Sequence, residues 1–301
     1  GTYSTDLSIA AGSAGSATAT VSMEVSSWTP PTPSVKLAGR VIHQFGNVPV
    51  PGLRVQFAGV TVVTGATGAF KVPGDPISTL SDLTVSGTGY YLRQTFAKTG
   101  DSEWRVVPTS FNMNAFDDLA RDEHATHTLR WIGPPTIYVD TQPEGFEAGP
   151  ELEKWISQVR VQAAAFVTDW SGQTIVPSDV IVTSRPPQDN TAGTIVIHFS
   201  ENASDYGNTD FIGVTRMSWS SNGAMNSAAI WLRYKRYSGD GYAPKRQGIL
   251  GHELGHAMGY GHMTSGTASF MDPSLGSKTG LSAFGRQAAL LVYTRASRNL
   301  S

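Results

Sequence analysis

Three histidines near the C-terminal end restrict how this part of the chain can fold. Residues 251–262 read Gly-His-Glu-Leu-Gly-His-Ala-Met-Gly-Tyr-Gly-His, with histidines at 252, 256 and 262. On a helix, His252 and His256 lie four residues and about 40° apart, so both imidazoles face one point. A continuing helix would carry His262 about 240° round and about 9 Å along, away from that point. The helix must therefore end before His262, and Gly259 suits such an end because glycine adopts a left-handed conformation without steric cost.

Three neutral imidazoles form a donor set that is suited to catalytic zinc. They leave the metal a fourth position for water, whereas structural zinc sites, the alternative, carry four protein ligands. Zinc lowers the pKa of its water towards about 7 and polarises a carbonyl group. Glu253 projects beside the metal and is placed to accept a proton from this water and pass it to a leaving amine. The sequence therefore predicts one zinc ion, with His252, His256 and His262 as ligands and Glu253 as general base.

This segment is the signature of the metzincin metallopeptidases, and its residues most resemble the matrixin branch. The family also has a methionine in a tight turn beneath the zinc, and Met271 in the sequence Ser-Phe-Met-Asp-Pro matches it. The sequence departs from the matrixin pattern at Met263, where matrixins usually have serine. Matrixin latency depends on a propeptide cysteine and is excluded here, because the chain has no cysteine. The resemblance covers the second half of the chain and implies a metzincin-type zincin domain.

The apolar pattern after residue 133 predicts an α/β (α+β) domain at residues 134–301. Strands are expected at 136–140, 179–184, 193–199, 213–219 and 227–232, and helices within 145–170 and at 244–258 and 283–295. The family resemblance implies that the strand at 213–219 borders the substrate cleft and pairs with an extended peptide. A purely structural edge strand is the alternative. The residues expected to contact substrate are Gly213, Val214, Thr215, Arg216 and Met217.

Residues 35–110 show short β-type runs separated by turn residues, which predicts a small, antiparallel, all-β sandwich. Strands are expected at 39–43, 53–57, 61–64, 69–72 and 83–85. Gly39-Arg40-Val41, Val48-Pro49-Val50-Pro51-Gly52, Val55 and the run from Thr64 to Phe70 resemble the carboxypeptidase-regulatory-like, transthyretin-like β-sandwich family. The resemblance covers residues 36–98 and implies an accessory domain without an active site. A lone histidine makes no metal site, so His43 is not expected to be a ligand.

Two further segments complete a multi-domain organisation. Residues 1–34 are rich in Ser, Thr and Pro and are expected to be a spacer, with an optional strand within 18–25. Residues 111–133 are expected to form a linker with a helix at 114–130. His124 and His127 lie three residues apart on that helix, but a solvated linker helix is expected in preference to a metal site.

Composition narrows the function classes. With 22 Lys and Arg against 24 Asp and Glu, the net charge of −2 gives no field to attract nucleic acid or an anionic membrane. The sequence contains no apolar run of about 18 residues, so no transmembrane segment is predicted. The lack of cysteine excludes disulfides, thiolate nucleophiles and cysteine-bound zinc. The charge-poor, Ser/Thr/Gly-rich composition favours an extracellular or cell-surface bacterial protein, with Gly1 as a processed terminus.

The sequence thus predicts a secreted zinc endopeptidase that acts as a monomer on protein or peptide substrates. One alternative is a surface adhesion or binding module with a vestigial peptidase scaffold, and another is a zinc hydrolase acting on a non-peptide amide. Two loops are candidate calcium-binding sites. Neither loop has a complete calcium-binding spacing, so ordinary polar loops are expected. The candidate calcium ligands are Asp205, Asn208, Asp210 and Asp240.

Overall fold

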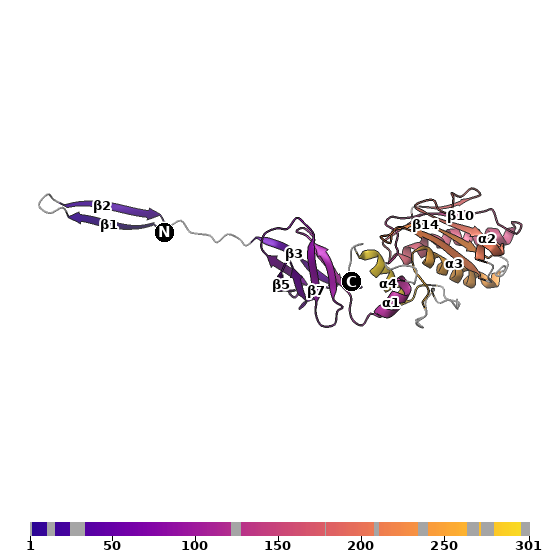
Figure 1. Ribbon diagram of the computed structural model, residues 1–301, viewed down its shortest axis with the longest axis horizontal. Coiled ribbons are helices and arrows are strands. Elements are labelled where there is room, and N and C mark those ends of the chain that lie inside the picture. The colour runs from indigo at the N-terminus through magenta and orange to yellow at the C-terminus, as the bar shows by residue number, and fades with distance from the viewer. Residues whose placement is uncertain are drawn as a thin grey trace.

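The chain combines several β-sheets with α-helices and therefore has mixed α and β content (Figure 1). The computed structural model describes residues 2–10, 16–24, 34–121, 128–177, 179–207, 211–233, 240–263, 271 and 280–295. Within these ranges the chain forms four α-helices, none of which is long and apolar enough to cross a membrane.

The N-terminal segment contains a pair of strands in place of the single strand predicted there. β1 (Thr2–Ala10) and β2 (Ser16–Glu24) pair antiparallel, with Thr2 opposite Glu24 and Ala10 opposite Ser16. The interpretation as a spacer missed β1, although its residues Tyr3, Leu7 and Ile9 lie at the odd positions that period-2 patterning requires.

Two sheets formed by residues 35–106 pack around one apolar core, as the sequence predicted. The first has the order β6-β3-β9 and the second the order β5-β4-β7-β8. Alternate residues face inward, and Val41, Val55, Leu83 and Trp104 from both sheets share the core. The strands are β3 (Val35–His43), β4 (Arg54–Phe57), β5 (Val60–Val63), β6 (Ala69–Pro73), β7 (Ser81–Ser86), β8 (Arg93–Ala97) and β9 (Glu103–Val106).

One strand pair differs from the predicted antiparallel sandwich. β9 runs parallel to β3, with Val41 opposite Trp104. The chain leaves the four-stranded sheet after β8 and crosses to the other sheet, where it meets the free side of β3 in the same direction. Neither β8 nor β9 was predicted from the sequence, and the parallel pair depends on this crossover between sheets.

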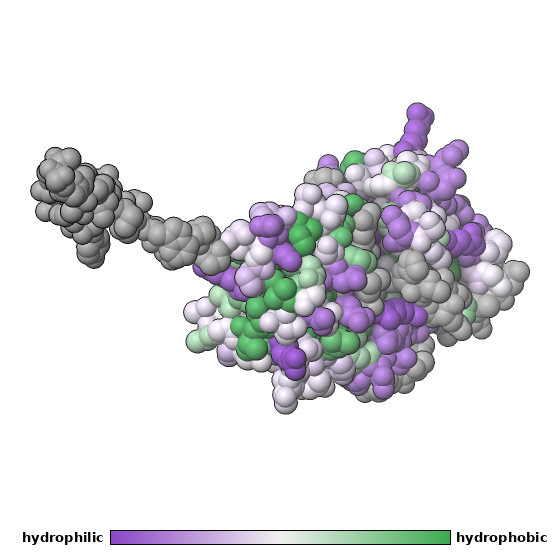
Figure 2. All heavy atoms as spheres, turned by 60° about the vertical axis from the view of Figure 1, so that its left-hand side comes forward, coloured by the Kyte–Doolittle hydropathy of each residue, from purple (hydrophilic) through white to green (hydrophobic). Residues whose placement is uncertain are grey.

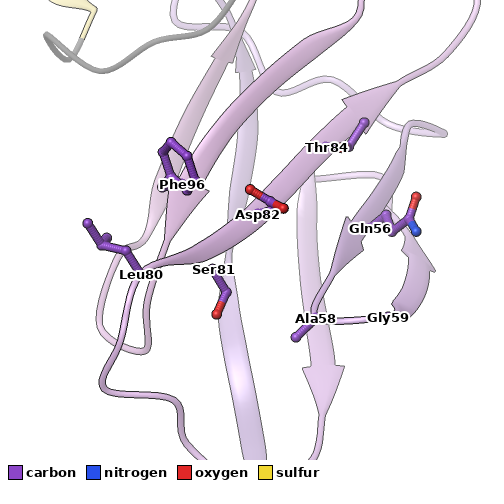
Figure 3. Close-up of a pocket in the computed structure, with 8 residues that line it drawn as sticks. All are labelled: Gln56, Ala58, Gly59, Leu80, Ser81, Asp82, Thr84 and Phe96. Atoms are coloured by element: carbon purple, nitrogen blue, oxygen red, sulfur yellow. The ribbon is translucent and has the colours of Figure 1, made fainter.

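The outer face of the four-stranded sheet carries apolar side chains and a shallow hollow. Figure 2 shows apolar residues, in green, on the face of the sandwich. The hollow has a volume of about 640 Å³. Figure 3 shows Leu80 and Phe96 on one side of it, Gln56 on the other and Asp82 between them. It lies on the sandwich and not on the domain that carries the three histidines.

The C-terminal half contains a five-stranded sheet with the order β11-β10-β12-β14-β13. β13 is an edge strand and runs antiparallel to β14, whereas the other neighbours are parallel. All six residues of β12 are buried, as expected for a central strand covered on both faces. The strands are β10 (Thr136–Asp140), β11 (Val180–Thr183), β12 (Thr194–Phe199), β13 (Gly213–Trp219) and β14 (Met225–Leu232).

Helices α2 (Pro150–Trp170) and α3 (Ala243–Ala257) pack against this sheet and against each other (Figure 1). α2 begins with proline at its first position, and its buried residues Leu152, Trp155 and Val159 recur at the expected spacing of three to four. α4 (Ala283–Thr294) follows near the C-terminus. The order of strands and helices from residue 136 onward is the one predicted from the sequence.

The segment between the two domains differs from the predicted solvated linker helix. Its helix, α1 (Met113–Ala120), is shorter than the expected 114–130, and His124 and His127 lie outside the described residues. The apolar core of the C-terminal domain includes this segment, so the two cores divide at Val106 and Val107 rather than near residue 134. The buried residues that it contributes are Val107, Phe111, Phe116, Leu119, Ala120, Leu129 and Trp131.

The sandwich contacts the C-terminal domain through α4 and this segment. The Gln44 amide donates a hydrogen bond of 2.7 Å to the Thr294 hydroxyl. The ring of Phe111 lies 5.0 Å from that of Phe45 in the sandwich and stacks on Phe284 of α4 at 5.3 Å. Figure 1 accordingly shows α1 and α4 on the side of the C-terminal domain that faces the sandwich.

Candidate metal centre

Helix α3 and the loop after it bring three histidines together. The Nε2 atoms of His252 and His256 lie 3.1 Å apart. The ring of His262 lies 5.2 Å from that of His252 and 4.7 Å from that of His256. One ligand atom from each histidine lies within 4.8 Å of the others, so the group is close enough to hold a metal ion.

His262 reaches this group because α3 ends before it. The helix stops at Ala257, and Gly259 has a φ of +95° in the left-handed region that favours glycine. The Tyr260 amide then donates to the Gly255 carbonyl at 3.1 Å, which reverses the chain direction. The helix end that the histidine spacing predicts is therefore present at Gly259.

A backbone hydrogen bond orients the imidazole of His256 towards the other two histidines. The Nδ1 atom of His256 donates to the Tyr260 carbonyl at 2.8 Å, which assigns its proton to Nδ1 and directs the Nε2 lone pair at the other histidines. Burial, followed by the neighbouring His252 and His262, lowers the pKa of His256 to about 3. His256 is therefore a neutral imidazole, the form that binds metals.

Glu253 lies beside the histidines in a buried environment. Its side chain is 4% exposed, and burial raises the pKa of the carboxyl group to about 7. The Thr215 hydroxyl opposes this shift by donating to Glu253 Oε2 at 2.7 Å. Thr215 was predicted to lie in the edge strand, but its contact with Glu253 was not predicted, because residue spacing carries no signal for a contact between distant elements.

The strand predicted to border a substrate cleft runs next to Glu253. At Gly213, a side chain would overlap the Glu253 carboxylate, so glycine allows β13 to approach this closely. Arg216 differs, because it lies over the Trp231 ring at 4.6 Å and donates to the Asp205 carbonyl at 3.1 Å. Of the five predicted residues, Gly213 and Thr215 contact Glu253, whereas Val214 and Met217 are half-buried against apolar clusters.

Met271, the predicted turn methionine, lies against the histidine-bearing helix at Gly255. It is fully buried, and its carbonyl accepts a hydrogen bond of 2.9 Å from the Met263 amide. A side chain at Gly255, between the two helical histidines, would overlap the Met271 sulfur. Residues 264–270 and 272–279, the rest of the predicted turn, lie outside the described residues.

The remaining predicted ligands gain no support from the described part of the chain. Asp205 accepts a hydrogen bond from Ser200, while Asn208, Asp210 and the side chain of Asp240 lie outside what the structure describes. Within the described residues, the three histidines are the only group of three such side chains whose ligand atoms lie close enough together to hold a metal ion. His43 accepts a hydrogen bond from the Phe45 amide at 3.1 Å. Calcium binding therefore stays a prediction.

A second polar cluster, which the sequence analysis did not single out, lies on the sheet. His198 on β12 contacts Asp140 through Nδ1 at 3.1 Å and Asp189 through Nε2 at 2.8 Å, and stacks on Trp231. Burial lowers the pKa of His198, but hydrogen bonds to the two carboxylates outweigh it, so that the pKa is raised. Because both ring nitrogens are hydrogen-bonded to carboxylates, the cluster links β10, β12 and the loop at Asp189.

Comparison with known proteins adds no family assignment. No protein-family model matches the chain, and no curated protein matches it.

Proposed function

We propose that this chain is a zinc-dependent endopeptidase of the metzincin type. One observation carries the proposal: three imidazoles converge on a single point, and a buried carboxylate, Glu253, lies beside them. A structural metal site has no need of such a carboxylate and has a fourth protein ligand. Three ligands with an adjacent base are the arrangement of a hydrolytic metal site.

The donor set fits zinc. Ligand nitrogens of a tetrahedral zinc site with bonds of 2.0–2.1 Å lie about 3.3 Å apart, close to the 3.1 Å between Nε2 of His252 and Nε2 of His256. The hydrogen bond from His256 to the Tyr260 carbonyl fixes the ring orientation and raises the basicity of the ligand. When bound by His252, His256 and His262, zinc would supply Lewis acidity towards water and a substrate carbonyl.

Glu253 would move the proton in the reaction. Its raised pKa, about 7, suits a group that must accept a proton from attacking water and later release it to the leaving amine. Thr215 holds Oε2 of Glu253, which leaves Oε1 to receive that proton. Burial excludes bulk water from the carboxylate and fixes its direction.

Strand β13 supports peptides as the substrate class. It is the outermost strand of its sheet and has no strand on its other side within the described residues. An extended peptide that pairs with this edge would run past Glu253, which Gly213 and Thr215 contact. This arrangement favours a peptide bond over other amides as the substrate. The composition of the chain accords with an extracellular or cell-surface location.

The replacement Glu253→Gln tests the proposal. We expect the variant to keep zinc, measured by metal analysis, and to lose cleavage of casein by several orders of magnitude, because glutamine cannot accept the proton. Glu153→Gln on α2 makes the same chemical change away from the histidines and should leave both quantities unchanged. His256→Ala should lose zinc and activity together.

Two results would contradict the proposal. Casein cleavage by Glu253→Gln at the wild-type rate would exclude the mechanism. Stoichiometric zinc in a wild-type protein that cleaves nothing in a proteome-derived peptide library would favour the binding module with a vestigial scaffold. The same library, analysed by mass spectrometry, would also define the side-chain preference.

A further inference from the structure

The segment that joins the two domains contacts the loop that carries His262. The Gly261 amide, adjacent to His262, donates a hydrogen bond of 2.8 Å to the Leu119 carbonyl. Leu119 lies in the last turn of α1, where carbonyl groups have no partner within their own helix. The end of α1 and the metal-site loop thus satisfy each other's backbone groups.

A second contact lies at the residue that ends α3. A side chain at Gly259 would come within 2.6 Å of the Leu129 carbonyl oxygen and 2.7 Å of the Leu129 Cβ. The loop therefore packs directly on the backbone of residue 129. Leu129 is itself buried, so this surface has little freedom to retreat.

A third contact caps the helix that bears the other two histidines. The indole nitrogen of Trp131 donates to the Ala257 carbonyl at 2.9 Å, and the Trp131 side chain is 4% exposed. The Tyr293 hydroxyl of α4 donates to the next carbonyl, that of Met258, at 3.0 Å. Side chains from outside α3 therefore satisfy the carbonyls at the end of the helix, immediately before the loop to His262.

The segment is itself held firmly. The Asn112 side chain caps α1 by accepting from the Ala115 amide at 3.1 Å, and Phe116 and Leu119 are buried in the core. Phe111 stacks on Phe284 of α4. The surface that α1 presents to the metal-site loop is therefore fixed.

We propose that residues 111–120 and 128–131 are a positioning element of the metal site, which sets the place of His262 relative to the two helical histidines. Leu119, Leu129 and Trp131 act through the loop and do not touch the metal. The inference rests on the proposed function for its effect on catalysis, but its effect on metal affinity is independent of any peptidase activity. A segment that the sequence presents as a linker thereby belongs to the site.

Substitutions in the full-length chain test this role. Trp131→Phe keeps a buried aromatic ring but removes the hydrogen bond to Ala257. Leu129→Ala removes the buried side chain beyond Cβ that anchors residue 129, the residue on whose backbone the loop packs at Gly259. We expect each to weaken zinc binding by about tenfold or more, measured by competition with a chromophoric chelator, as loss of supporting groups around a metal site does. Cobalt substitution should show an altered visible spectrum, which reports ligand geometry without activity.

Matched controls separate positioning from a general loss of stability. Trp155→Phe and Leu152→Ala change the same residue types in the same core, but on α2. At an equal decrease in melting temperature, they should keep wild-type zinc affinity and the wild-type cobalt spectrum. If Leu129→Ala does not fold, Trp131→Phe alone decides.

The outcomes for the inference and for the proposed function are distinct. Wild-type zinc affinity in Trp131→Phe, or equal weakening in the control variants, overturns the positioning role. Zinc affinity that falls only in the segment variants supports it, even if the wild-type protein proves to have no peptidase activity. An absence of peptidase activity in the wild-type protein would contradict only the proposed function.

Discussion

At the scale of single residues, the candidate site depends on how Glu253 is held. The carboxylate is buried and therefore costly to ionise, and the Thr215 hydroxyl is the donor that favours its charged form. The identity of Glu253 was predictable from the histidine spacing. The role of Thr215 was not, because it depends on the distance at which β13 passes α3.

Thr215→Val should slow catalysis without removing the metal. Valine keeps the shape but loses the hydrogen bond to Glu253 Oε2, and a hydrogen bond to a charged group contributes about 1.5–3 kcal/mol. We expect kcat to fall about tenfold or more in peptide hydrolysis, with KM and zinc content little changed. Thr215→Ser retains the hydroxyl and should recover most of the rate. A Thr215→Val variant with the wild-type rate would show that the contact is incidental.

At the scale of elements, periodicity predicted the helices and strands that are long or strongly patterned. The stripe of Leu152 and Val159 identified α2, and the histidine spacing identified the end of α3. The end of α1 at Ala120 was missed, because the carbonyl of Leu119 in its last turn bonds to Gly261, more than a hundred residues away in the sequence. Local patterns carry no signal for such a contact.

Gly259→Ala tests the end of α3. Alanine at a φ of +95° is strained by about 1–2 kcal/mol, and its Cβ would also overlap Leu129. We expect the free energy of unfolding to decrease by more than the strain energy alone, and zinc binding to weaken. Gly193→Ala places alanine at a φ of +80° with no atom within 4 Å, so it isolates the strain. Equal destabilisation of the two variants would exclude the packing contribution.

At the scale of the whole molecule, the boundary between the two cores differs from the boundary in composition. The Gly-Pro-Pro run at 133–135 predicts a domain boundary, yet the C-terminal core includes Val107 and the segment after it. Turn residues mark where the chain changes direction, and they carry no information on which side chains share a core. The mixed α and β content was predictable, whereas the packing of the segment between the two domains was not.

The division between the two cores determines which fragments of the chain should fold. A fragment of residues 134–301 lacks Phe116, Leu119, Leu129 and Trp131, each buried in the C-terminal core. Burial of such side chains contributes about 1.5–3 kcal/mol each, and their sum is comparable with a domain's total stability of about 5–15 kcal/mol.

We therefore expect fragment 134–301 to be insoluble or unable to bind zinc, whereas fragment 107–301 should unfold cooperatively and bind the metal. Circular dichroism melting and metal analysis of both fragments would decide. Full zinc affinity in fragment 134–301 would refute this division of the chain and, because that fragment lacks Leu119, Leu129 and Trp131, the positioning role of the segment as well.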